Sequence, residues 1–416
     1  MDYFAFSSII ALILAIIIGV KRCVNIGIMS MLFAFLLGKF VYDMNLGKLI
    51  VTGWPTGLFV IMMSVMLLFA FATTNDTTKI LASKLAYSCR NYAKLLPWVF
   101  MLATGLLTFC GADPTVAAFM LPIALMVGDR VGLNPLILMV MIIAGADIGS
   151  AGPFSVIGVV TSGLAKEIGV DNYFAVWAAT ATAMMIHSLL AYFLLGGWKA
   201  KAIDGNLELE KPEPFNTKQK ITLAIIALVL CMILFFKIPI GAAMLIGVAF
   251  MLLFKVSDEK LAIKSVNWNV LIMVSGTSIL INVMNEVGGI KMLAQGLSTI
   301  MTPFTATTIL ALMGGLMTSV SSGTGVVMPT LIPTVPEIAN AVGGGLQYVE
   351  YVQAIQSGAI GSVVYSPLSP LGAIALGALP DHYNTREIFT KMIFVAIIAL
   401  VVTLTLNISG VFRFFI

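Results

Sequence analysis

Residues 109–115 read Phe-Cys-Gly-Ala-Asp-Pro-Thr, a polar and backbone-breaking stretch inside a long apolar region. Apolar runs lie on both sides of it, near residues 95–110 and 114–128. Each run is shorter than the ~20 residues that a helix needs to cross a bilayer. Two short helices joined in this way can enter and leave the membrane on the same side. The stretch therefore predicts a re-entrant helical hairpin over residues 95–128.

A second stretch of the same kind lies in the other half of the chain. Residues 321–325 read Ser-Ser-Gly-Thr-Gly, between apolar runs near 303–320 and 324–336. A Leu-Pro pair follows the first stretch at Pro122, and an Ile-Pro pair follows the second at Pro333. We therefore expect a second hairpin over residues 303–336.

The composition indicates a protein whose main solvent is the bilayer. Of the 416 residues, 60% are hydrophobic and 10% are charged, whereas a soluble domain carries roughly 25% charged residues. The net charge of +4 is dispersed, which argues against a nucleic-acid partner. Four cysteines lack paired spacing, so neither a disulfide framework nor a zinc site is expected. The predicted fold class is an all-α polytopic membrane protein, and residues 4–20 are interpreted as a retained first helix rather than a signal peptide.

The two halves of the chain repeat the same pattern. Gly145-Ala146-Asp147-Ile148-Gly149 matches Gly358-Ala359-Ile360-Gly361, and Trp54 matches Trp268 at the start of a long apolar run. Because each half has an odd number of crossings, the repeats have inverted topology, the arrangement of many secondary transporters. The predicted units are the N-terminal repeat 1–197 with hairpin 95–128 and discontinuous helix 135–165, the cytoplasmic linker 198–218, and the C-terminal repeat 219–416 with hairpin 303–336 and discontinuous helix 350–378.

The basic residues favour one orientation. With the N-terminus outside and both hairpins re-entrant, 17 of the 23 lysines and arginines fall on the cytoplasmic side. This bias agrees with the positive-inside rule. We therefore expect a multi-pass protein of the inner (plasma) membrane with both termini extracytoplasmic.

The candidate site lies where four clusters of Gly, Pro, Ser, Thr and Asp interrupt apolar runs. Broken helices leave N–H and C=O groups that the bilayer tolerates only beside a polar cavity. Half-helix N-termini suit a substrate carboxylate, and unwound carbonyls suit a cation. The predicted substrate-binding residues are Thr115, Ser155, Ser322, Gly323, Thr324, Ser366, Pro367 and Ser369. The predicted cation-binding residues are Gly111, Ala112, Asp113, Asp147, Ser321 and Gly325.

Asp113 and Asp147 carry the only acidic side chains of these clusters. A charged group at the centre of a bilayer costs roughly 2.5–3.5 kcal/mol or more. One interpretation is that they bind the coupling ion, Na+ or H+, and the alternative is that each caps the half-helix that follows. No further cofactor is expected.

The chain resembles the ion-transporter superfamily, most closely the malonate/dicarboxylate carrier group near the divalent-anion:sodium symporters. The resemblance rests on the hairpin tips together with Leu96-Pro97-Trp98-Val99, Ser366-Pro367-Leu368-Ser369-Pro370 and Ala378-Leu379-Pro380-Asp381. It implies hairpins that meet in mid-membrane, a homodimeric scaffold, and small organic anions carried with cations. In the symporters each tip holds a Ser-Asn-Thr motif that contacts substrate and sodium. Here the tips read Ala112-Asp113-Pro114 and Gly323-Thr324-Gly325, a departure that leaves the substrate and sodium sites open.

The expected function is cation-coupled transport of a small carboxylate, such as a three- or four-carbon dicarboxylate. One alternative is a sodium/proton antiporter, which the two aspartates would suit. Another is the large membrane subunit of a carrier that needs a periplasmic receptor, which is not favoured. An enzyme is not expected, because the chain has only two histidines and no nucleophile–base–acid set.

The orientation can be tested with single cysteines in a background that lacks the four native ones. A cysteine in the 199–218 linker should react only with a reagent on the cytoplasmic side, and one at Gly344 only with an external reagent. Labelling of both from the same side would show that a hairpin crosses the membrane completely, and the inverted repeat would be wrong.

Overall fold

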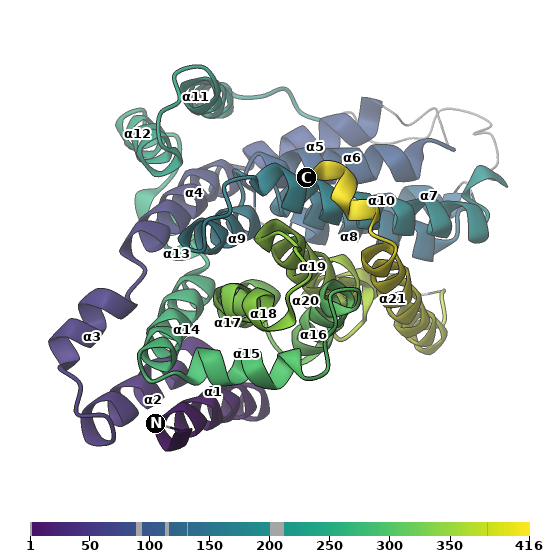
Figure 1. Ribbon diagram of the computed structural model, residues 1–416. Coiled ribbons are helices and arrows are strands. Elements are labelled where there is room, and N and C mark those ends of the chain that lie inside the picture. Colours follow the sequence, from purple (N-terminus) through teal and green to yellow (C-terminus); the bar gives the residue numbers. More distant parts are fainter. Residues whose placement is uncertain (1, 89–93, 113–115, 131, 200–211, 381) are drawn as a thin grey trace.

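The computed structural model describes residues 2–88, 94–112, 116–130, 132–199, 212–380 and 382–416 (Figure 1). The regular structure in these ranges is helical throughout. Six of the described helices are long and apolar enough to cross a membrane, and several shorter apolar helices lie between them. This agrees with the all-helical, polytopic class predicted from the composition.

The first half of the chain has three helices long enough to cross a membrane, with shorter elements between them. Its helices are α1 (Asp2–Arg22), α2 (Ile26–Phe40), α3 (Leu46–Gly53), α4 (Thr56–Thr74), α5 (Thr77–Ser88), α6 (Leu96–Phe109), α7 (Ala117–Arg130), α8 (Pro135–Ser150), α9 (Val156–Glu167) and α10 (Tyr173–Leu194). A single 3-10 turn, η2 (Gly197–Lys199), follows.

The second half has the same order of long, short and broken elements. They are α11 (Thr217–Leu234), α12 (Ile240–Leu253), α13 (Glu259–Ser265), α14 (Trp268–Glu286), α15 (Gly289–Ser298), α16 (Ala306–Val320), η3 (Gly323–Val327), α17 (Met328–Leu331), η4 (Ile332–Thr334), α18 (Val335–Val342), α19 (Tyr348–Gly361), η5 (Val363–Tyr365), α20 (Pro370–Gly377), α21 (Thr385–Ile408) and η6 (Val411–Phe415). Here one arm of the hairpin is divided into η3, α17, η4 and α18, where Pro329, Pro333 and Pro336 interrupt the regular ladder.

Two short helices, α3 and α13, lie just before the long helices α4 and α14. Asn45 begins α3 and Asp258 begins α13, and each side chain accepts a hydrogen bond from a backbone N–H of the first turn. Asn and Asp are strong N-cap residues because they pair an N–H that the helix leaves free. Both helices are much shorter than a membrane span and were not among the predicted segments.

The halves pack through corresponding helices. α2 of the first half packs against α14 of the second, and α4 packs against α12. Within each half the entering hairpin arm packs against the first part of the broken helix, α6 on α8 and α16 on α19. Figure 1 shows α17 to α20 in the middle of the molecule, between α14 and α8.

Glycine lets the hairpin arms approach the broken helices closely. A Cβ added at Gly145 of α8 would overlap the Met101 carbonyl oxygen of α6, and one at Gly358 of α19 would overlap the Ala311 carbonyl oxygen of α16. These two glycines begin the motif that repeats in the sequence. Small residues allow this close backbone contact between helices in membranes, where van der Waals packing drives association.

Gly358→Ala should therefore separate α16 from α19 and destabilise the protein by about 1–3 kcal/mol. The matched control is Gly296→Ala in α15, where an added Cβ would have nothing within 4 Å. The control should be neutral or stabilising by up to about 1 kcal/mol, because alanine favours helix more than glycine does. The melting temperature in detergent should be lower for Gly358→Ala than for Gly296→Ala. Equal melting temperatures would show that close packing at Gly358 does not contribute to stability.

Candidate functional site

The tip of the second hairpin is a turn held by its own hydroxyl groups. Ser321 Oγ donates to the Met317 carbonyl at 2.7 Å, which closes the end of α16. Ser322 Oγ accepts from the Gly325 N–H at 3.0 Å, which begins η3. A Cβ at Gly325 would overlap the Met273 side chain of α14, so the tip packs closely against that helix. The Ser321 hydroxyl thus donates back to α16, whereas Ser322 accepts a backbone N–H and keeps its hydroxyl hydrogen to donate. Gly323 is buried and Thr324 is half-buried.

The second broken helix is interrupted between Gly361, where α19 ends, and Pro370, where α20 begins. Ser369 caps α20: its Oγ accepts from the Gly372 N–H at 2.9 Å and donates to the Val364 carbonyl at 2.6 Å. Ser366 Oγ accepts from the Leu368 N–H at 3.3 Å. These bonds hold the interruption open as an ordered loop.

A cavity of about 470 Å³ lies between this loop and the second hairpin tip. This volume falls within the ~300–1,000 Å³ of ordinary small-molecule sites. Its polar lining is Asp147, Asn267, Thr318, Ser319, Ser321, Ser322, Thr324, Ser366 and Ser369. Its apolar lining comes from α4, α9, α14, α19 and α20, so both halves of the chain contribute to one site.

Asp147 is the one ionisable side chain among the described residues that line this cavity. It lies in the last turn of α8 and is only 3% exposed. Ser150 Oγ donates weakly to Oδ1 at 3.4 Å, and Oδ2 has no hydrogen-bond partner. Asp147 does not cap α9, because Ser155 occupies that N-cap position. A carboxylate at a helix C-terminus faces the negative end of the helix dipole. Its charge therefore needs a cation or a proton.

The two broken helices treat their free carbonyl groups differently. At the first break, Trp177 Nε1 of α10 donates to the Ile148 carbonyl at 2.9 Å, and the Tyr173 hydroxyl donates to the Ala151 carbonyl at 2.6 Å. At the second break, Ala359 and Ile360 line the cavity. A Cβ added to Gly323 would lie 3.6 Å from the Ala359 carbonyl oxygen, so this carbonyl is next to the hairpin tip. Both breaks therefore border the cavity, the first through Asp147, Val156 and Ile157, but α10 pairs two carbonyls of the first break.

The structure brings together half of the residues singled out in the sequence. Those that line the cavity are Asp147, Ser321, Ser322, Gly323, Thr324, Ser366 and Ser369. Others are buried but are not among its lining residues, namely Gly111, Ala112, Ser155, Gly325 and Pro367. Asp113 and Thr115 lie outside the described residues. Ser155 instead donates to the Thr108 carbonyl and so joins the first break to the first hairpin.

Sequence reasoning missed the lining that α4 and α14 provide. Met66 comes from the middle of α4, and Asn267 and Val270 come from the start of α14. Thr318, also missed, lies in the last turn of α16, and its Oγ1 has no hydrogen-bond partner. A polar residue at the start of an apolar run, Asn267, could have indicated that α14 lines the site. Asparagine is also a common N-cap residue, and Asn267 does cap α14.

Comparison with known proteins agrees with this architecture. Residues 4–150 match the family model described as the N-terminus of the dicarboxylate carrier protein MatC, which confirms the resemblance to that group over this stretch. The YdaH transporter of Alcanivorax borkumensis has a similar structure, with a TM-score of 0.62 at 14% identity over 88% of each chain. MtrF of Neisseria gonorrhoeae, from a class of antimetabolite efflux pumps, gives a TM-score of 0.53 at 13% identity over 87% of this chain and 82% of MtrF.

A comparison with curated sequences gives no match. The likeness to the two solved structures shows the fold, that of an all-helical, multi-pass membrane protein.

Carbonyl pairing at the first break by α10 can be tested with Tyr173→Phe. This change leaves the Ala151 carbonyl without its donor and should destabilise the protein by about 1–3 kcal/mol, the cost of an unpaired buried polar group. The control is Tyr3→Phe, because Tyr3 is 73% exposed. The melting temperature in detergent should fall for Tyr173→Phe but not for Tyr3→Phe. An unchanged melting temperature for Tyr173→Phe would show that the Ala151 carbonyl finds another donor.

Proposed function

We propose that this chain is a secondary active transporter that moves a small organic anion across the membrane together with Na+ or H+. The observation that carries the proposal is Asp147, a buried carboxylate with a free oxygen on a cavity that also contains the second hairpin tip. We propose a dicarboxylate as the substrate because residues 4–150 match a family model named for a dicarboxylate carrier.

The proposed coupling follows from charge. An ionised Asp147 repels an anion in the same cavity, where low dielectric makes the repulsion strong. A cation or proton on Asp147 removes this repulsion, and the anion can then bind at the hairpin tip. The Ala359 carbonyl, next to the tip, would supply a second oxygen ligand to a cation. Anion and cation therefore bind together and leave together.

The proposed mechanism is alternating access by two inverted repeats, residues 1–197 and 219–416. The equal order of elements in the two halves supports it, as does the reciprocal packing of α2 on α14 and of α4 on α12. Inverted repeats have two related arrangements, so that one cavity can open to either side of the membrane. Each hairpin would then close the cavity from its own side.

A sodium/proton antiporter is the second candidate, because the ionisable side chain on the described cavity lining is acidic. An antiporter would acidify or alkalinise liposomes in a sodium gradient without any organic anion. A pH-sensitive dye inside proteoliposomes therefore distinguishes the two functions. A pH change driven by sodium alone indicates the antiporter, and uptake that requires an organic anion indicates the proposed carrier. Activity of the purified chain alone would also argue against a need for an auxiliary receptor.

Asp147→Asn tests the coupling. The variant keeps the size of the side chain and removes its charge, so uptake against a gradient should fall to the level of empty liposomes. Exchange of internal for external substrate should survive, because the hairpin tip is intact. Both are measured with labelled carboxylate in proteoliposomes.

Asp258→Asn is the matched control. Asp258 caps α13 through the Leu261 N–H at 2.8 Å and is exposed, and asparagine caps nearly as well. This variant should transport normally. Concentrative uptake by Asp147→Asn at the wild-type rate would overturn the assignment of Asp147 to coupling.

A further inference from the structure

A second polar cavity lies apart from the one that contains Asp147. Its volume is about 600 Å³, and the two cavities have no described lining residue in common. It lies between the start of α8, the end of α10 with η2, and the start of α21. α10 and α21 are long enough to cross the membrane, and the ends of such helices lie near the lipid headgroups. Trp198 of η2 is 51% exposed there, as is common for tryptophan at a membrane surface.

An apolar crevice continues from this cavity along the same three helices. Leu194 and Leu195 line both the cavity and the crevice. From Lys391 in the cavity to Ala399 in the crevice, α21 rises about 12 Å at 1.5 Å per residue. Leu194 is 75% exposed and Ile398 is 51% exposed, so the crevice opens to the outer surface of the helices. Apart from His187, the rest of its lining is apolar: Val140, Leu190, Ala191, Val395, Ile398 and Ala399.

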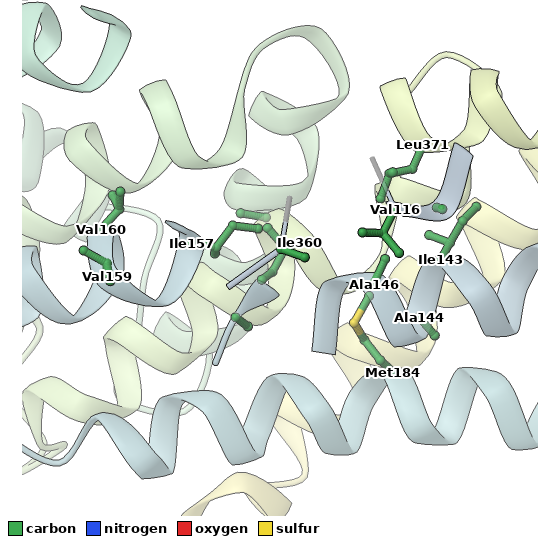
Figure 2. Close-up of a cluster of buried hydrophobic side chains, with 14 of the residues drawn as sticks. Val116, Ile143, Ala144, Ala146, Ile157, Val159, Val160, Met184, Ile360 and Leu371 are labelled. Atoms are coloured by element: carbon green, nitrogen blue, oxygen red, sulfur yellow. The ribbon is translucent and has the colours of Figure 1, made fainter. Parts of the chain in front are cut away.

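His187 does not make the crevice polar, because both ring nitrogens are directed at protein groups. Nδ1 lies 3.5 Å from the Tyr365 hydroxyl, and Nε2 lies 3.3 Å from the Thr403 hydroxyl. The crevice ends one turn deeper along α10. There Figure 2 shows Met184 beside Ala146 of α8, and both side chains are buried. The crevice is thus a groove of limited depth on the lipid-facing side of α10 and α21.

The polar cavity has one positive charge in excess. Its described lining includes Lys199, Lys391 and Glu387. Lys391 forms an ion pair with Glu387 one turn before it on α21, and both side chains are about half exposed. The Lys199 ammonium lies 5.0 Å from the centre of the Trp198 ring and has no carboxylate within ion-pair distance among the described residues. The cavity can therefore balance one negative charge.

The surroundings of the cavity do not cancel this charge. α8 and α21 begin at the cavity and α10 ends there, so two positive helix ends are opposed by one negative end. Asp129 adjoins the cavity through Tyr383, but its carboxylate accepts from the Tyr383 hydroxyl at 2.8 Å and pairs with His382 at 3.1 Å.

We propose that the cavity and the crevice together bind one anionic phospholipid of the surrounding bilayer. Its phosphate lies at Lys199 and Lys391, and one acyl chain lies in the crevice between α10 and α21. A lipid explains both parts of the groove, since a soluble anion would leave the crevice empty and a neutral lipid would leave the charge unbalanced. Basic pockets between membrane helices are suited to anionic headgroups for this reason.

The experiment measures binding to the purified, delipidated chain in a neutral detergent, through the rise of the melting temperature with ligand concentration. The ligands are phosphatidylglycerol, phosphatidylcholine with the same acyl chains, and inorganic phosphate. Phosphatidylglycerol should bind about fivefold more tightly than phosphatidylcholine, because its net charge meets a lysine at the membrane surface. Inorganic phosphate at the same concentrations should give no shift. In 1 M salt the preference for phosphatidylglycerol should disappear, because the Debye length falls to about 3 Å.

A lysine pair tests the headgroup end. Lys199→Gln should weaken phosphatidylglycerol by about fivefold and leave phosphatidylcholine unchanged, because it removes the unpaired charge of the cavity. The control is Lys264→Gln, since Lys264 is an exposed lysine of α13 that lines neither the cavity nor the crevice. It should bind both lipids as the wild type does. Without lipid, both variants should melt with the wild type, because both lysines are exposed.

An isoleucine pair tests the acyl-chain end. Ile398→Ala removes part of the crevice wall and should weaken phosphatidylglycerol by about threefold, the effect of losing roughly one methylene of apolar contact. Ile397→Ala is the matched control, because Ile397 is equally exposed on α21, at 53%, but does not line the crevice. Equal binding by the two variants would overturn the placement of the acyl chain.

The ligand panel can also overturn the proposal. Equal affinity for the two lipids would show that the groove does not select a charge. A shift with inorganic phosphate as large as that with phosphatidylglycerol would identify a site for a soluble anion, and the lipid would be wrong. The same holds if phosphatidylglycerol gives no shift. These titrations contain no carboxylate substrate, and the groove has no described residue in common with the cavity of Asp147, so their failure leaves the proposed transport function in place.

Discussion

The architecture depends on one constraint, that a backbone N–H or C=O group inside a bilayer must find a partner. A continuous helix meets this constraint by itself, but a broken helix does not. This chain interrupts α8–α9 after Ser150 and α19–α20 after Gly361, and so exposes carbonyl groups in apolar surroundings. Everything around the two breaks can be understood as a way of pairing these groups.

The two breaks meet the constraint in different ways, although the motifs that produce them are related. At the first, two aromatic side chains of α10 donate to the Ile148 and Ala151 carbonyls. At the second, serine hydroxyls within the loop hold the chain, and the Ala359 carbonyl lies beside the hairpin tip. Two halves with the same order of elements thus contribute differently to the site. Each half contributes to the same cavity, but the second half supplies its polar loop and the first supplies its carboxylate.

Close packing connects this chemistry to the rest of the fold. Gly145 and Gly358 allow the hairpin arms to lie directly against α8 and α19. Without that contact the hairpin tip and the second break would not border a common space. Asp147 is then held at the end of α8 by packing rather than by ion pairing, which explains how a carboxylate with one unpaired oxygen remains buried. Such a group is stable only if a cation or proton accompanies it, and this is the physical basis of the coupled transport that we propose.

The sequence by itself determined the helical class and the candidate polar clusters, and it predicted the hairpins at 95–128 and 303–336 and the discontinuous helices at 135–165 and 350–378. Gly, Pro, Ser and Asp inside an apolar run are a local signal, because the bilayer tolerates broken backbone only in special places. Helices as short as α3 and α13 lack such a signal and were missed.

Only the tertiary structure decided which clusters meet. It placed Asp147 with the second hairpin tip, engaged Ser155 with Thr108, and added Met66, Asn267 and Val270 to the lining. These relations join residues that are far apart in the sequence, 47 positions in the case of Ser155 and Thr108, and they depend on how the helices pack. Local sequence patterns contain no information about such packing.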